Sequence, residues 1–188
     1  MLALDPKRFE AALRSNIRRA NALNGKVAEG AIRSTIQSGV EPKNAALTQA
    51  IKGGDKPLVD SSALFANITS KVVDDWTVFV GTLRTNKTYN VAKNVHDGMT
   101  ITVTPRMRGL FFRLWKASQD ARFAEGLEGR AAALYERYQG WLPLNPSTES
   151  IVIPARPYIN KTFEDSGLRG TLLDNWSQAV QLSCKQGA

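Results

Sequence analysis

The chain has 188 residues, 43% of them hydrophobic, which is enough to bury the core of one ordinary domain. Its single cysteine excludes an internal disulfide and a cysteine-based zinc cluster, and neither a run of eighteen apolar residues nor a signal peptide is found, so a soluble, non-secreted protein is expected. The formal net charge of +8 indicates an acidic partner, either nucleic acid or an acidic protein surface. We expect a single domain over residues 1–188 that opens with a basic helical segment at 1–40.

The first predicted element is a long amphipathic helix. Over residues 6–38, apolar residues recur at helical spacing and basic residues lie mostly on the opposite side. The pattern fits one helix or two helices joined near Gly25. Asp5 before Pro6 is typical of an N-cap followed by proline at the first helical position. A short helix is predicted next, at 44–52.

Short strands and helices follow without regular alternation. A hairpin is predicted over 68–80 with its turn at Asp74-Asp75, because β-branched and aromatic residues alternate with other residues on both sides. A third strand is predicted at 99–103 and a fourth at 151–153. The helices are predicted at 89–96, from 105 onward, at 129–139 and from 168 almost to the end. This order indicates an α+β fold, with a small antiparallel or mixed sheet of three to four strands flanked by amphipathic helices.

Positive charge is concentrated in residues 84–116, which hold seven basic residues and one acidic residue. The helix after the third strand turns apolar side chains to one face and basic ones to the other. We expect Phe111, Phe112 and Trp115 in the core or in a subunit contact, because aromatic residues are not interleaved with the basic ones as in single-strand binders. DNA binding by the basic face would be sequence-independent and would weaken steeply with salt.

No catalytic or metal-binding pattern is found. His96 is the only histidine and lies near a predicted helix end, where a structural role is expected. Asp74 and Asp75 fit turn chemistry better than metal ligation. Phosphate loops and nucleophile elbows do not occur in the sequence. We therefore predict no enzyme activity, no cofactor and no metal, and we expect Cys184 to be a buried, inert thiol.

Several short segments occur in a telling order. They are Pro57 to Ile68, Val80-Gly81-Thr82, Tyr89, His96 with Gly98, and Pro154 to Tyr158. Together they resemble the phage virion morphogenesis family, the tail-completion and neck proteins of long-tailed phages. That family has Pro-Leu-Val-Asp-Thr-Gly-x-Leu-x-x-Ser-Ile, then Val-Gly-Thr, Tyr-Ala, His near Gly, and Pro-Ala-Arg-Pro-Phe. The resemblance covers roughly residues 45–180 and departs from the pattern at Ser61-Ser62, Asn67 and Tyr158.

The resemblance implies a structural virion protein at the phage neck or at the head-proximal end of the tail. Such a protein forms a ring, commonly six-fold, that completes or terminates the tail tube, joins it to the head connector and leaves a channel for DNA. Its partners would be copies of itself, the tail tube protein, the head-tail connector proteins and the genomic DNA, with no membrane. It would be made in the host cytoplasm and located in the virion.

The residues themselves suggest how a ring could form. The proline-stiffened segment 151–159 and the strand edge at 99–103 are expected to contact a neighbouring subunit, although a strand-to-helix connection within one subunit is the other interpretation. The expected subunit-contact residues are Ile101, Val103, Ile153, Pro154, Arg156, Pro157 and Tyr158. The residues expected to face DNA or an acidic partner are Arg14, Arg18, Arg106, Arg113 and Lys116. The alternative function is a sequence-independent DNA-binding protein that acts outside a ring.

Overall fold

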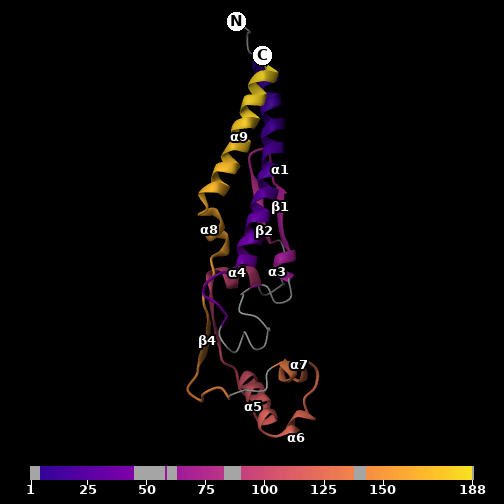
Figure 1. The fold of residues 1–188 in the computed structure, drawn as a ribbon, viewed down its shortest axis with the longest axis vertical. Coiled ribbons are helices and arrows are strands. Elements are labelled where there is room, and N and C mark those ends of the chain that lie inside the picture. Colours follow the sequence, from indigo (N-terminus) through magenta and orange to yellow (C-terminus); the bar gives the residue numbers. More distant parts are fainter. Residues whose placement is uncertain (1–4, 45–57, 59–62, 83–89, 138–142, 188) are drawn as a thin grey trace.

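Two long antiparallel helices dominate one half of the molecule. The computed structural model describes residues 5–44, 58, 63–82, 90–137 and 143–187. Helix α1 (Pro6–Ser38) and helix α9 (Ser166–Gly187) lie side by side (Figure 1). The two ends of the described chain meet there, since the Asp5 N–H donates to the Gly187 carbonyl at 2.9 Å. Among the described residues, no helix combines the length and the apolar character needed to cross a bilayer.

Helix α1 begins where the sequence predicts and runs without a break. The Asp5 carboxylate caps the first turn, and Pro6 follows it. The helix is not divided at Gly25. The missing side chain instead lets a hairpin approach, because a Cβ at this position would lie 2.9 Å from the Cβ of Ser70 and 3.0 Å from Cγ2 of Val78.

The hairpin consists of β1 (Ile68–Val72) and β2 (Val78–Thr82), preceded by the short helix α3 (Ala63–Ala66). Its opposed residues are Ile68 and Thr82, Ser70 and Val80, and Val72 and Val78. In the turn, the Asp74 carboxylate accepts the N–H of Trp76 at 2.8 Å. This is the local backbone bonding that the sequence predicts for a turn aspartate.

A second pair of strands carries three helices away from α1. Helix α4 (Val91–Asp97) leads into β3 (Met99–Thr102), which pairs antiparallel with β4 (Ser150–Ile153). The helices between these strands are α5 (Pro105–Gln119), α6 (Ala121–Ala124) and α7 (Gly129–Arg137), which together we call the lobe. After β4 the chain returns through α8 (Tyr158–Phe163) to α9. Figure 1 shows the lobe at the opposite end of the molecule from the chain ends.

The α+β class and the long N-terminal helix are confirmed, but the strands are arranged differently from the prediction. The described strands form two sheets of two strands instead of one sheet of three to four. The hairpin β1–β2 packs on α1, whereas β3–β4 extends toward the lobe (Figure 1). Local alternation indicates that a segment is a strand, but which strands pair depends on contacts between distant segments. The helix predicted at 44–52 lies outside the described residues, apart from Asn44.

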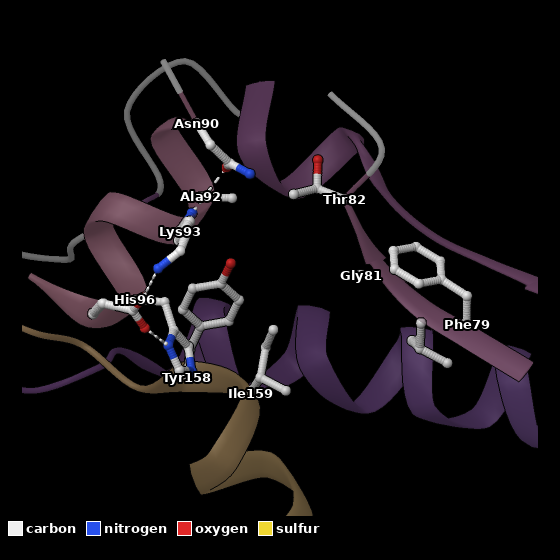
Figure 2. A pocket seen from close by; sticks show the side chains of 11 residues that line it. Phe79, Gly81, Thr82, Asn90, Ala92, Lys93, His96, Tyr158 and Ile159 are labelled. Carbon is white, nitrogen blue, oxygen red and sulfur yellow. Dashed lines mark hydrogen bonds and ion pairs between the residues drawn. The ribbon is translucent and has the colours of Figure 1, made fainter. Parts of the chain in front are cut away.

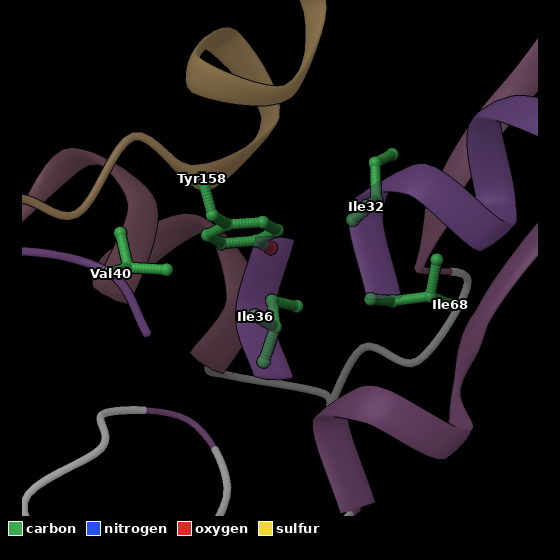
Figure 3. Packing of buried hydrophobic residues seen from close by; sticks show 5 residues of the cluster. All are labelled: Ile32, Ile36, Val40, Ile68 and Tyr158. Carbon is green, nitrogen blue, oxygen red and sulfur yellow. The ribbon is translucent and has the colours of Figure 1, made fainter. Parts of the chain in front are cut away.

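An apolar core lies where α1, β1 and α8 meet. Ile32, Ile36, Val40, Ile68 and Tyr158 form a buried cluster there (Figure 3). Complete burial of such a side chain contributes about 1.5–3 kcal/mol each. The cluster therefore fixes the C-terminal half of α1 to the hairpin and to the start of α8.

The contact between α1 and α9 is polar over much of its length. Asn16, Asn21 and Asn24 are buried along α1. Their side-chain partners on α9 are Ser183, Trp176 and Asn175, at 3.0, 2.8 and 2.7 Å. We call this row the asparagine ladder, and it satisfies buried polar groups that would otherwise be costly.

The asparagine ladder determines which face of α9 is buried against α1. Leu168 and Ala179 are buried, but Trp176 and Val180 remain 37% and 42% exposed. The expectation of a buried Cys184 is wrong, because this thiol is exposed. The reason is that α9 turns a face containing asparagine and serine toward α1, which leaves part of its apolar surface outside.

Candidate functional site

Segments that carry the family resemblance come together around one pocket. Strand β2 brings Gly81 and Thr82, α4 brings His96, and α8 begins with Tyr158 (Figure 2). The pocket has a volume of about 250 Å³. This is below the roughly 300–1,000 Å³ typical of small-molecule sites, so a structural joint explains it better than a ligand site does. Of the segment at 57–68, the structure describes only residues 58 and 63–68.

The backbone of the Pro-Ala-Arg-Pro-Tyr segment is attached directly to the end of α4. The Arg156 N–H donates to the carbonyls of Val95 and His96 at 3.0 and 3.1 Å. Gly98 has φ +78°, and a Cβ there would lie 2.7 Å from the backbone nitrogen of Ala155. Residue 98 must therefore be small and must adopt a conformation that favours glycine. We call this contact between residues 95–98 and 154–158 the motif joint.

The Arg156 side chain extends the joint to the segment that follows α1. Only 7% of the residue is exposed, and its Nε donates to the Pro42 carbonyl at 2.8 Å. A second bond reaches the Lys43 carbonyl at 3.4 Å. Burial lowers the pKa of the Arg156 guanidinium below its ordinary value. Arg156 thus ties its own segment to the end of α4 through its backbone N–H and to the segment after α1 through its guanidinium.

Tyr158 and His96 complete the joint. The Tyr158 ring lies in the apolar core and contacts the His96 ring edge to face, with centroids 5.5 Å apart (Figures 2 and 3). Burial raises the pKa of the Tyr158 hydroxyl, and the Asp97 carboxylate adds to this effect. His96 Nδ1 lies 2.7 Å from Asp97 Oδ1, and hydrogen bonds from Lys93 and then from His96 lower the pKa of Asp97. These contacts fix the orientation of the Tyr158 and His96 rings and hold the backbone of the two segments together.

Among the described residues, no group of three or more histidine, cysteine, aspartate or glutamate side chains is placed to hold a metal ion. No family model matches the chain. Searches among curated proteins and solved structures find no match either. The resemblance therefore rests on the sequence segments, and function has to be argued from their geometry.

The expected subunit-contact residues fall into three groups. Arg156, Tyr158 and Val103 are buried within the chain. Ile101 and Ile153 are half-buried on the β3–β4 pair, and Pro154 and Pro157 are exposed. The segment is thus a strand-to-helix connection within one subunit, which was the other interpretation. Its exposed prolines, together with the 68% exposed Val152 beside them, are the part left for a neighbour.

The basic residues separate into two sets. Arg14 and Arg18 lie on α1 and pair with Asp75 of the hairpin turn, at 3.5 and 3.7 Å, and Arg14 also pairs with Glu10. Their charge is partly neutralised by these acidic neighbours. Arg106 and Arg113 are exposed on α5 and form no ion pair with any described residue.

Aromatic rings surround Lys116, the last basic residue of α5, in an arrangement that the sequence did not predict. The Lys116 ammonium lies 5.1 Å from the ring centroids of both Phe112 and Phe123. These rings are 45% and 49% exposed, so Phe112 is not a core residue, and the other expectation for it, a subunit contact, stays a prediction. The four-residue spacing of Phe112 and Lys116 signals a shared helix face. Phe123 comes from α6 and gives no such signal.

Proposed function

We propose that this chain is a structural protein of the neck or head-proximal tail end of a tailed phage. It forms a ring that completes the tail tube, joins it to the head connector and leaves a channel for DNA. The observation that carries this proposal is the motif joint between the end of α4 and the start of α8, together with the pocket beside it that β2 lines. These residues supply hydrogen bonds and packing, as expected of segments that a structural family keeps for its fold.

The architecture supplies surfaces that suit a ring. The lobe extends from the paired helices on the β3–β4 strands (Figure 1), and within the described chain each of these strands pairs only with the other. Their outer edges can therefore accept a neighbour's backbone. The exposed surface beside them includes Val152, Pro154 and Pro157. We propose this surface as one subunit contact.

Assembly with the tail tube protein of the same phage tests the proposal. The purified chain, alone and mixed with tube protein, is measured by mass photometry and imaged by electron microscopy. We expect rings that cap tubes of uniform length. Val152→Glu places a charge on the proposed contact and should abolish capping without changing thermal unfolding. Leu173→Glu is the matched control, because Leu173 is 61% exposed on α9, away from the β3–β4 pair.

A chain that stays monomeric and leaves tubes uncapped would overturn the proposed function. The alternative, a DNA-binding protein acting outside a ring, is favoured by the unpaired Arg106 and Arg113. A salt titration with duplex DNA separates the two, because binding by several basic residues gives a steep salt dependence. Strong salt-dependent binding of the monomer, without capping, would support the alternative.

A further inference from the structure

The turn between β1 and β2 exposes apolar side chains beside the carboxylate of Asp74. Trp76 is 59% exposed and Val73 61% exposed. Asp74 is exposed and has no cationic partner among the described residues, whereas Asp75 pairs with arginines of α1. The hydrogen bond from the Trp76 N–H, and after it one from the Thr77 side chain, lowers the pKa of Asp74 below its ordinary value. The turn therefore presents an aromatic side chain next to a negative charge.

The lobe contains a hollow of complementary character. It has a volume of about 390 Å³ and is lined by Arg108, Gly109, Phe112, Pro143, Leu144 and Pro146. Apart from Arg108 the lining is apolar, and the Arg108 guanidinium is already bonded to the carbonyls of Asn145 and Thr148. Nothing lies within 4 Å of the position a Cβ would take at Gly109. A large apolar side chain can thus approach the α5 backbone closely.

Positive charge borders this hollow. Helix α5 carries four basic residues and no acidic one. Arg106, Arg113 and Lys116 project from the face that also carries Gly109 and Phe112, as their helical spacing requires. Arg106 and Arg113 have no ion pair within the described chain. The lobe therefore combines an apolar hollow with an uncompensated basic border.

These two surfaces cannot meet within one molecule. The hairpin turn lies against the N-terminal half of α1, where the Asn21 amide donates to the Asp75 carbonyl at 2.9 Å. The lobe lies at the other end of the molecule (Figure 1). Complementary surfaces at opposite ends of one chain produce head-to-tail contacts, which close into a ring when the rotation between subunits allows it.

We propose that the β1–β2 turn of one copy, residues 73–76, docks into the α5 hollow of a second copy, with Trp76 in the hollow and Asp74 facing Arg113. This contact rests on the proposed ring and gives it a second interface. Tryptophan and arginine are the residue types that most often dominate binding energy in such interfaces. The charges contribute orientation and association rate.

Nucleic acid fits the hollow less well. Among the described residues around the hollow, Arg106 and Arg113 are the cations without a partner, and their spacing of seven positions along the helix corresponds to about 10 Å. Two phosphate contacts would give weak binding with a shallow salt dependence. The Phe112 and Phe123 rings already contact the Lys116 ammonium, which leaves them less available to stack on bases.

Sedimentation velocity of the full chain over a hundredfold concentration range tests the contact. We expect Trp76→Ala and Arg113→Glu each to weaken self-association at least tenfold. Asp74→Arg should also weaken it, and the double variant Asp74→Arg/Arg113→Glu should recover a large part of the loss by exchanging the charges. Leu182→Ala and Arg19→Glu are matched controls at exposed positions on α9 and α1, and should behave like the original chain. Circular dichroism verifies that each variant is folded.

The outcomes separate this contact from the proposed function. Self-association whose strength is unchanged by both Trp76→Ala and Arg113→Glu overturns the contact, even if rings still cap tubes. A chain that is monomeric over the whole range overturns it as well. So does loss of duplex DNA binding in Arg113→Glu with unchanged self-association, which would make the lobe a nucleic-acid surface. Self-association through Trp76 without tube capping supports the contact and counts against the phage assignment.

Discussion

At the scale of single residues, Gly98 is the most constrained position of the motif joint. Its φ of +78° is unfavourable for any residue with a side chain, and a Cβ would meet the backbone of Ala155 and the carbonyl of Ile153 at 2.7 and 3.0 Å. Both obstacles are backbone atoms and cannot rotate away. We predict that Gly98→Ala lowers the free energy of unfolding by about 3 kcal/mol, measured by urea denaturation.

A second glycine provides the control. Gly30 lies within α1, and nothing lies within 4 Å of the position of its missing Cβ. Gly30→Ala should stabilise the protein by about 0.5–1 kcal/mol, because alanine favours the helix. Equal effects of the two substitutions would contradict the role assigned to residue 98.

At the scale of elements, Glu29 links α1 to β1. Only 7% of this residue is exposed. Its carboxylate lies 2.9 Å from Lys26 Nζ and 2.9 Å from Arg33 Nη2, and it accepts the Ser70 hydroxyl at 3.0 Å. Arg33 in turn donates to the Ile68 carbonyl at 2.7 Å. The hydrogen bond from Lys26 is the main cause that lowers the pKa of Glu29 below its ordinary value of 4.5, and the bond from Ser70 adds to it.

This pKa shift sets the direction of the pH dependence. A carboxyl whose pKa is lower in the folded state stabilises the fold above the unfolded pKa, and this contribution is lost as the pH falls below about 4.5 toward the folded value. We predict that Glu29→Gln lowers the free energy of unfolding by about 2 kcal/mol at pH 7. The difference between the two proteins should shrink between pH 5 and pH 3, measured by urea denaturation at each pH.

Glu10→Gln is the matched control for this prediction. The Glu10 side chain is 65% exposed and pairs only with Arg14 on the same helix. Exposed pairs of this kind contribute well under 1 kcal/mol. A Glu29→Gln difference that stays constant from pH 7 to pH 3 would show that the carboxylate charge has no part in joining α1 to β1.

The sequence predicts well those elements whose ends are determined by neighbouring residues. The cap at Asp5, followed by Pro6, begins α1 as predicted, and Thr104 before Pro105 caps α5 in the same way, because a cap needs only neighbouring residues. The asparagine ladder was not predictable in this way. From the sequence alone, Asn16, Asn21 and Asn24 look like surface residues. Their side-chain partners lie on α9, more than 140 positions away in the chain. The same long-range pairing exposes Cys184.

In the candidate site too, the sequence identified the individual segments but not the contacts between segments that are distant in the chain. The motif segments were identified from sequence, but their convergence was not, since Arg156 bonds to residues 42, 43, 95 and 96 across long intervals. Two proposed contact residues, Arg156 and Tyr158, proved to be internal for this reason. The basic face of α5 was predicted from its period, whereas the hollow beside it depends on the returning segment at 143–146.

At the scale of the whole molecule, the lobe is an insertion between two paired strands. The Val103 N–H donates to the Glu149 carbonyl at 2.8 Å, which closes the strand pair just before the lobe begins. The apolar core contains residues of α1, β1 and α8 and Val40, two positions after α1, and none from the lobe. Leu114 and Ala117 are buried within the lobe itself. The lobe and the remainder of the described chain therefore have separate interiors.

This separation predicts the result of removing the lobe. Replacing residues 104–148 by Asn-Gly joins β3 to β4 through a two-residue turn that suits antiparallel strands. We predict cooperative thermal unfolding, followed by circular dichroism, with a midpoint within about 10 °C of that of the full chain.

The same variant should self-associate more weakly than the full chain, because the α5 hollow is absent and only the proposed contact at the β3–β4 pair remains. Mixing it with the full chain should still allow one contact, since its Trp76 turn remains able to enter the hollow of an intact copy. We therefore expect the variant to be incorporated only at one end of an oligomer and to shorten chains or prevent rings from closing. A variant that unfolds would contradict the separate interiors, whereas one that still forms closed rings would show that the lobe is not a link between subunits.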